Sequence, residues 1–289
     1  MREILRHLKI WLMLVRLNFM SQMEYRANFV SGILMETGYL AAKLMYVLVA
    51  YEAGRRIAGF GPDEILVFVG TYVALTGFYA GVFAANLFQL SSLVRDGSFD
   101  TILVKPVNDQ FLATFRRSDM GAFLLDFVAG LAMVAIGLVR LRAGDAAPGL
   151  GATGLAASSG FAAAGPGMGV LMVAGWGLFA ASGAAVGYAI WVMPMTLVFR
   201  FVRADSLAHL ADSFWDFNNV PMVVYGKVGQ AIGVFVIPIF VITNFPALFA
   251  LGRLPPLWLA WGLISPAVFL SLTAWLWKRG LRHYASGGN

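Results

Sequence analysis

The 289-residue sequence contains no cysteine, and this absence excludes disulfide bonds, thiolate metal sites and a cysteine nucleophile. Its three histidines, His7, His209 and His283, are scattered and form no metal-ligand motif. Charged residues make up only 12% of the chain, whereas 60% is hydrophobic and the mean hydropathy is +0.76. A soluble domain needs far more charge on its surface, so this composition predicts a membrane-embedded protein.

Signatures of catalysis are missing as well. The sequence has no G-x-x-x-x-G-K-[ST] loop, because its Gly226-Lys227 pair is followed by Val228 in an apolar run. The H-E-x-x-H and G-x-S-x-G motifs are also absent. We therefore predict no catalytic residue, no metal ligand and no cofactor in this chain, and no nucleic-acid partner.

Six hydrophobic segments are long enough to cross the hydrocarbon core of a bilayer, which takes about 20 residues of α-helix. They predict an all-α polytopic membrane protein with spans at about 28–50, 65–89, 119–139, 170–198, 230–250 and 257–277. The Gly- and Ala-rich stretch 144–169 is only weakly apolar. We interpret it as an extracytoplasmic loop, with at most a surface helix.

The placement of basic residues indicates the orientation. With the N-terminus in the cytoplasm, most of the 21 lysine and arginine residues fall in cytoplasmic segments, as the positive-inside rule requires. A seventh span at 144–169 would put the last two basic clusters outside. The sequence therefore favours six spans with both termini cytoplasmic.

Two parts of the chain differ in character. Within residues 1–26 the apolar side chains recur on one helical face, opposite most of the basic ones. This pattern predicts an N-terminal amphipathic helix lying in the membrane interface. Residues 27–289 form the six-span domain.

The first cytoplasmic loop carries a charged interruption, LVRDGSFDTILVKPVNDQF, at residues 93–111. Asp96-Gly97 predicts a turn, and Ser98 is a candidate N-cap of a short helix over about 98–104. Pro106 limits this helix because it pushes the residue before it out of helical geometry.

The short helix has an apolar face, since Phe99, Ile102 and Leu103 are spaced i, i+3, i+4. Asn108 is expected to cap a second helix whose last turn carries Arg116 and Arg117. This construction suggests a docking surface. The alternative is a helix that rests in the headgroup region.

The run RDGSFDTILVKPVN, from Arg95 to Asn108, resembles the arginine–x–glycine–x–x–aspartate…leucine–x–lysine/arginine–proline signature of bacterial type-2 ABC exporter permeases. The match is to the subgroup long described as a domain of unknown function. Weaker matches follow downstream: FWDFNNVP (214–221) with Tyr225, IPIF (237–240) and FPA (245–247). The resemblance covers nearly the whole chain.

The resemblance implies a permease in the bacterial cytoplasmic membrane that works with a dimer of ATP-binding subunits, which bind ATP and magnesium. It also implies a second permease, related or identical, and export of a drug, hydrophobic cation, lipid or peptide. The first cytoplasmic loop would then be the coupling helix. The residues concerned are Arg95, Asp96, Gly97, Phe99, Asp100, Ile102, Leu103, Lys105 and Pro106, with Phe99, Ile102 and Leu103 as the expected contacts.

Two features depart from the family pattern. The loop at about 251–256 is short and leaves little room for the re-entrant helices of some relatives, unless 246–256 dips back into the bilayer. The long Gly- and Ala-rich segment 144–169 has no counterpart that we can identify.

Three ionisable residues lie inside predicted spans: Glu36, Lys43 and Asp126. Such groups are costly in a bilayer and usually face a bundle interior or a wet cavity. One hypothesis is that Glu36 and Asp126 line a cytoplasm-facing cavity that favours a cationic amphiphile. The alternative is structural: Glu36 pairs with an arginine such as Arg26, and Lys43 snorkels or pairs across helices.

Two further segments have patterns of their own. Segment 200–229 has apolar residues at helical spacing and is expected to form an amphipathic helix at the membrane surface. The fourth span contains Gly175, Gly177, Gly183 and Gly187, which predict close helix packing.

Two other functional classes stay open. An ion-coupled secondary transporter would use the membrane charges as its coupling site, but the halves of the sequence contain no convincing repeat. A non-transporting scaffold subunit would use them only structurally.

Overall fold

The computed structural model describes residues 2–53, 56–146, 166–201 and 205–284. Within these ranges every regular element is helical, apart from one isolated bridge between Ile57 and Phe60. The predicted all-α class is therefore confirmed. Segment 144–169 falls mostly outside the described residues, between the end of α8 at Ala146 and the start of α9 at Pro166.

Five of the six predicted spans correspond to helices that are long and apolar enough to cross a membrane in the described part of the chain. They comprise α2 (Arg26–Ala53), α3 to α4 (Pro62–Arg95), α7 to α8 (Met120–Ala146), α9 (Pro166–Met195) and α13 (Pro256–Leu281). Two of them contain a π-helical turn, η1 (Ala80–Ala84) and η2 (Phe123–Phe127). The chain is a multi-pass membrane protein.

The segment expected as the fifth span, 230–250, is not one straight helix. It divides into α11 (Lys227–Ala231) with η7 (Ile232–Val236), and α12 (Ile239–Ala250), and the two parts are bent by 103°. Pro238 lies in the break, where its ring blocks helical continuation and removes a backbone donor.

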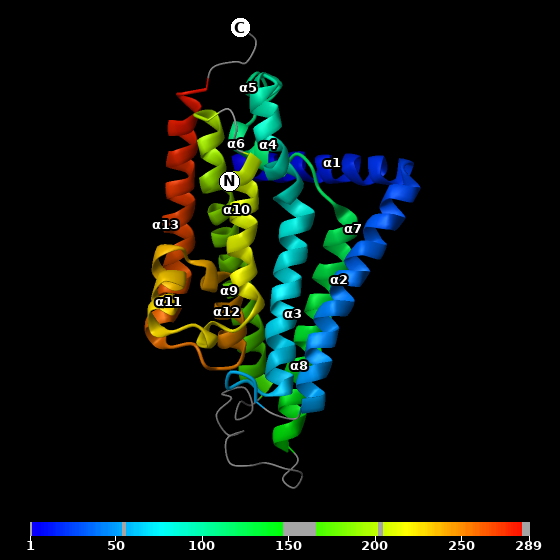
Figure 1. Cartoon of the computed structure of the whole chain (residues 1–289), viewed down its shortest axis with the longest axis vertical. Helices are drawn as coiled ribbons and strands as arrows, with labels where there is room; N and C mark the ends of the chain where they lie inside the picture. The colour runs from blue at the N-terminus through cyan, green and yellow to red at the C-terminus, as the bar shows by residue number, and fades with distance from the viewer. Residues whose placement is uncertain (1, 54–55, 147–165, 202–204, 285–289) are drawn as a thin grey trace.

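The helix expected at the membrane surface takes part in the crossing instead. α10 (Asp205–Trp215) runs along α9 in the bundle (Figure 1), and Trp215 is buried against Gly187. Gly187 lies 12 residues before Phe199, which is about 18 Å along the helix axis. The end of α10 at Trp215 therefore lies about 18 Å from the level of Phe199. The surface assignment for 200–229 was therefore wrong for α10, because it packs along α9 and buries Ala208, Ala211 and Trp215 within this chain, while Leu210 stays exposed.

α10 and α12 together carry the chain from one end of the bundle to the other. Both Trp215 and Ile242 contact Gly187, so the second half-helix resumes at the depth where the first stops. The excursion between them contains η5 (Asp216–Asn219), η6 (Met222–Val224), α11 and η7. It is joined to α12 by a hydrogen bond from the Met222 backbone N–H to Asn244 Oδ1, at 2.7 Å.

Both described ends of the chain lie toward the same end of the bundle, which also carries α5 (Asp100–Leu103) (Figure 1). We call this the α5 end. α1 (Arg2–Glu24) lies across the bundle there and exposes apolar side chains, as an interfacial helix would. At the opposite end Arg253 binds Glu64 at 2.5 Å and ties the 251–255 connection to the start of α3.

Among the described residues, α3 and α8 make the most extensive contact of any two helices. Gly70 and Gly77 on α3 face Gly130 and Asp126, and a Cβ added at Gly130 would meet backbone atoms of Ala74 and Gly70. Backbone atoms cannot rotate aside, so only glycine fits at this crossing.

We predict that Gly130→Ala destabilises the protein by about 1–3 kcal/mol, because the new methyl group forces the two backbones apart. Gly38→Ala is the matched control, since a Cβ there meets nothing within 4 Å. It should be neutral or stabilising by up to about 1 kcal/mol through helix propensity. Thermal unfolding in detergent measures both, and equal stabilities for the two variants would contradict the packing described.

Candidate functional site

The segment from Arg95 to Pro106 forms a turn and a single short helix. α4 (Ala85–Arg95) ends in a turn in which Gly97 has φ +71°, so the predicted Asp96-Gly97 turn is confirmed. α5 covers only Asp100–Leu103 and is shorter than the predicted 98–104. Ser98 does not cap it, because its hydroxyl is directed back to the Leu93 carbonyl, at 3.4 Å.

The apolar face of α5 turns inward. Phe99 is fully buried and Ile102 is 1% exposed. The ring centroid of Phe99 lies 5.2 Å from that of Phe199 and 5.3 Å from that of Tyr284. Phe99 and Ile102 therefore cannot be the contact residues expected on the surface in this conformation. They anchor the loop to its own chain.

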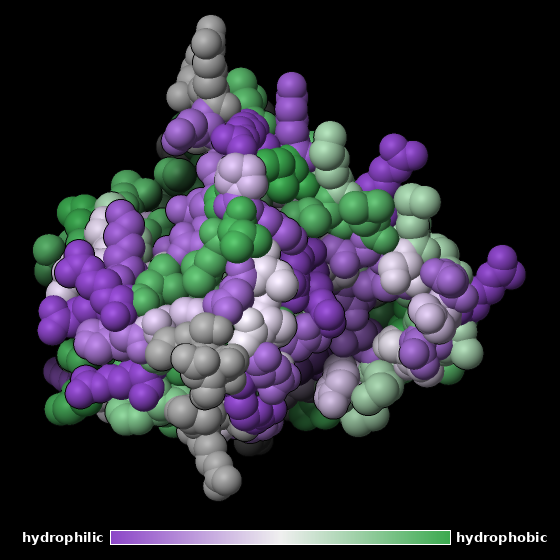
Figure 2. All heavy atoms as spheres, turned by 90° about the horizontal axis from the view of Figure 1, so that it is seen from above, coloured by the Kyte–Doolittle hydropathy of each residue, from purple (hydrophilic) through white to green (hydrophobic). Residues whose placement is uncertain are grey.

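The outer surface of α5 is made by other residues of the same segment. Leu103 is 41% and Val104 81% exposed, and the charged residues at the rim are exposed as well. The exposed set comprises Arg95, Asp96, Thr101, Leu103, Val104, Lys105 and Pro106. We call these residues the α5 tip. Figure 2 looks onto this end of the molecule, where hydrophilic and hydrophobic side chains are interspersed.

Three hydrogen bonds hold the segment from its flanks. Tyr284 donates to Asp100 Oδ1 at 2.9 Å, and Trp277 donates to Asp109 Oδ2 at 3.0 Å. From the other side, Arg6 on α1 donates to the Pro106 carbonyl at 2.6 Å. The segment is thus tied to both the first and the last helix of the chain.

The Tyr284 hydrogen bond is stable over the neutral range. Burial, together with the hydrogen bond to Asp100 and its negative charge, raises the pKa of Tyr284 from 10 to about 12. Because the folded-state pKa is the higher one, the stabilisation is complete below pH 10 and is lost only as the pH rises through about 12.

The second helix of the loop begins as expected. Asn108 caps α6 (Asp109–Phe115) by accepting from the Phe111 N–H at 2.8 Å. The helix ends at Phe115, so Arg116 and Arg117 follow it and do not form its last turn as predicted. The side-chain amide of Asn86 forms two hydrogen bonds with the backbone of Arg117. It donates to the Arg117 carbonyl at 2.7 Å and accepts from the Arg117 N–H at 2.8 Å.

The three membrane charges are divided between two places. Lys43 donates to Asn219 Oδ1 at 2.5 Å and lies 4.6 Å from the ring centre of Tyr72, so it pairs across helices. Glu36 lines a groove of about 290 Å³ between α1, α2 and α7 (Met120–Ala122), which Asp119 also lines.

Asp126 does not line that groove. Its side chain is buried on the neighbouring helix against Gly77. Asp126 and Lys43 therefore contribute nothing to the wall around Glu36.

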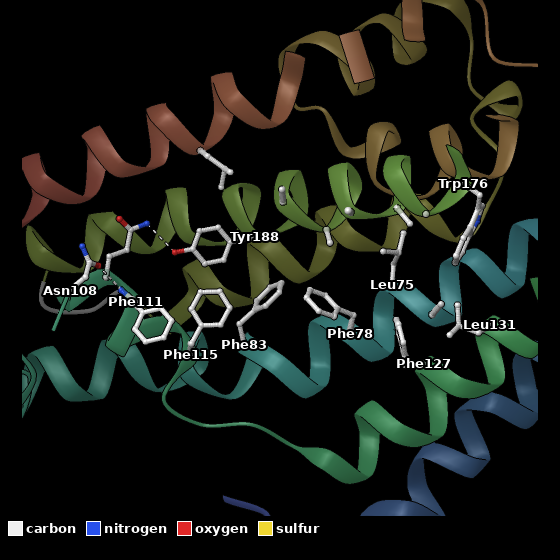
Figure 3. Close-up of a pocket in the computed structure, with 18 residues that line it drawn as sticks. Leu75, Phe78, Phe83, Asn108, Phe111, Phe115, Phe127, Leu131, Trp176 and Tyr188 are labelled. Carbon is white, nitrogen blue, oxygen red and sulfur yellow. Dashed lines mark hydrogen bonds between the residues drawn. The ribbon is translucent and has the colours of Figure 1, made fainter. Parts of the chain in front are cut away.

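Sequence reasoning missed one feature, an elongated apolar cavity of about 730 Å³ between α9 and the pair α3 and α8 (Figure 3). Its walls come from five separate stretches of the chain. No local motif marks such a space. The only signal in the sequence is the run of small residues on α9.

Comparison with known sequences identifies the family. The sequence profile described as ABC-2 family transporter protein matches residues 37–146 and 168–288, and so covers most of the chain. The chain belongs to the ABC-2 transporter family and is a membrane component of such a transporter. No curated protein and no solved structure matches the chain.

We predict that Tyr284→Phe loosens the α5 segment while preserving the ring packing on Phe99. Losing one hydrogen bond costs about 1 kcal/mol, which corresponds to about fivefold faster amide exchange in α5. Hydrogen exchange measured by mass spectrometry gives this rate. Tyr25→Phe is the control, since Tyr25 is exposed and lies at the junction of α1 and α2, outside the α5 segment. Unchanged exchange in Tyr284→Phe would contradict the proposed anchoring.

Proposed function

We propose that this chain is the permease subunit of a type-2 ABC exporter in the bacterial cytoplasmic membrane, driven by a separate dimer of ATP-binding subunits. Membership of the ABC-2 family supports this proposal. The sequence has no phosphate-binding loop of its own, so the ATP and magnesium would be bound by the partner. The substrate would be an amphiphilic or hydrophobic molecule.

The observation that carries the proposal is the α5 tip. It protrudes at one end of the bundle (Figure 1) and combines the exposed side chains of Leu103 and Val104 with charged neighbours. An apolar centre with a charged rim is the usual composition of a protein interface. The fully buried base at Phe99 makes the tip a firm attachment point instead of a loose loop.

The proposed mechanism follows from how the tip is attached. Closure of the ATPase dimer displaces the tip, and the contacts of Phe99 pass that displacement to η4 (Thr196–Phe199) and α13. The spans then move as rigid bodies to open an outward path. ATP can drive this change only if it favours one conformation over the other.

A second permease would complete the path. α2 supports this part of the proposal, because much of its apolar surface is uncovered, including Leu34, Met35 and Leu48. Such a surface contacts either lipid or another subunit. We propose that the second permease is a related but different chain.

The test is co-purification of the ATPase with a Leu103→Asp/Val104→Asp double variant. Two carboxylates placed in an apolar contact should weaken it by several kcal/mol, and the ATPase should be lost. Because both side chains point outward, the variant should fold. Gel filtration in detergent checks this point.

Leu257→Asp is the matched control. Leu257 is an exposed aliphatic residue at the opposite end of the bundle, in the first turn of α13, where the helix dipole favours an acid. This variant should retain the ATPase. Retention of the ATPase and full ATP-driven transport by the double variant would refute the coupling role, and transport without any ATPase would indicate a secondary transporter.

A further inference from the structure

The elongated cavity has the shape and chemistry of a site for a flexible apolar chain. It follows α9 from Trp176 to Tyr188, which is about 18 Å along the helix axis. Aromatic and aliphatic side chains form nearly the whole wall, and a row of rings that includes Phe78, Phe83 and Phe115 lies along it (Figure 3). Its volume of about 730 Å³ is in the usual range of small-molecule sites.

The small residues of α9 serve two different purposes. On the side facing α12, Gly175 and Gly183 lie so close to Phe249 and Ile242 that no Cβ would fit. Gly177, on the side of the cavity, has nothing within 4 Å of an added Cβ. Helix packing therefore explains the first two glycines but not the third.

The alanines that follow Gly177 on α9 also line the cavity with small side chains. Ala180, Ala181 and Ala184 line the cavity over the turns of α9 that follow Gly177, together with Leu75 of α3 and Leu131 of α8. In a membrane bundle small residues normally bring helices together. Here they leave an open space.

The two ends of the cavity differ. At the far end Trp176 forms part of the wall and is held by a hydrogen bond from its indole N–H to Thr71 Oγ1, at 3.0 Å. At the α5 end the wall becomes polar, with Asn108 exposed and Gln110 donating to the Tyr188 hydroxyl at 3.0 Å (Figure 3). The long apolar part of the cavity fits an alkyl chain, and its polar end fits the headgroup of an amphiphilic molecule.

We propose that this cavity binds the alkyl chain of the transported amphiphile, with the polar head at Asn108 and Gln110. The inference rests on the proposed exporter function, because it makes the occupant the cargo. Phe111 and Phe115 on α6 form part of the cavity wall, and α6 directly follows the α5 segment that is proposed to move. A site for cargo needs such a movable wall, whereas a site for a structural lipid does not. Movement of the α5 tip would therefore reshape the polar end of the cavity.

The experiment uses the complete complex of permeases and ATPase in lipid nanodiscs. The probe is a lysophosphatidylcholine with a diazirine at the end of its chain, which reacts with nearby residues on illumination. In the wild type, labelled peptides should include those that contain Trp176 and Leu131, at the far end of the cavity. The same complex reports whether the probe stimulates ATP hydrolysis.

Ala181→Phe fills the middle of the cavity, and Gly177→Leu is a second filling variant. Each should reduce cavity labelling by about tenfold and remove the stimulation of ATP hydrolysis by the probe. Ala174→Phe is the matched control: it makes the same change on the same exposed helix, two turns away and outside the cavity. It should behave like the wild type in both measurements.

Two results would overturn the inference. If the wild-type label falls only on lipid-facing residues outside the cavity, no alkyl chain binds there. If the cavity is labelled but Ala181→Phe is stimulated as strongly as the wild type, the occupant is a resident lipid and not the cargo. Neither result touches the proposed function, which fails separately if the ATPase does not associate.

Discussion

The burial of Phe99 against Phe199, Trp277 and Tyr284 is the contact on which the α5 end depends. It links a four-residue helix, too short to be stable alone, to the last turns of two long spans. Hydrogen bonds from Tyr284, Trp277 and Arg6 hold the flanks of the same segment. The result is an outward-facing tip on a buried base, so a force applied to the tip reaches the bundle instead of being absorbed by a loop.

The packing of the bundle differs from place to place: some helix pairs are in close contact, and others have a cavity between them. α3 and α8 meet at glycines with backbone against backbone, and α9 meets α12 in the same manner. α9 also contacts α3 through Trp176 and Trp191, and between Trp176 and Tyr188 it lines the cavity together with α3 and α8. The fifth crossing is made by two half-helices, α10 and α12, which start and stop at the depth of Gly187. The pairs α3–α8 and α9–α12 are each tightly packed, the cavity lies between them, and the fifth crossing is divided. Such an arrangement is suited to rigid-body movement of one pair relative to the other.

The sequence predicted those features that depend on local chemistry. Long apolar runs identified five spans, Asp96-Gly97 identified a turn, and Asn108 identified a cap. The errors have one physical origin, since periodicity reveals an apolar face but not what covers it. Phe99 was expected to face a partner and α10 to lie among headgroups, yet Phe99 is buried in its own chain and α10 packs one side against α9. The bend at Pro238 and the cavity arise from tertiary packing, which the hydropathy of 230–250 could not reveal.

The absence of cysteine makes a direct test of the coupling claim straightforward. Single cysteines placed at Val104 and at Leu257 can be treated, in the assembled complex, with a short reagent that joins a thiol to an amine. Both positions are exposed; Val104 directly follows α5, whereas Leu257 lies in the first turn of α13, which starts at the other end of the bundle (Figure 1). The account predicts that Val104→Cys cross-links to the ATPase subunit and Leu257→Cys does not. Cross-linking of the ATPase at Val104→Cys no greater than at Leu257→Cys would contradict it.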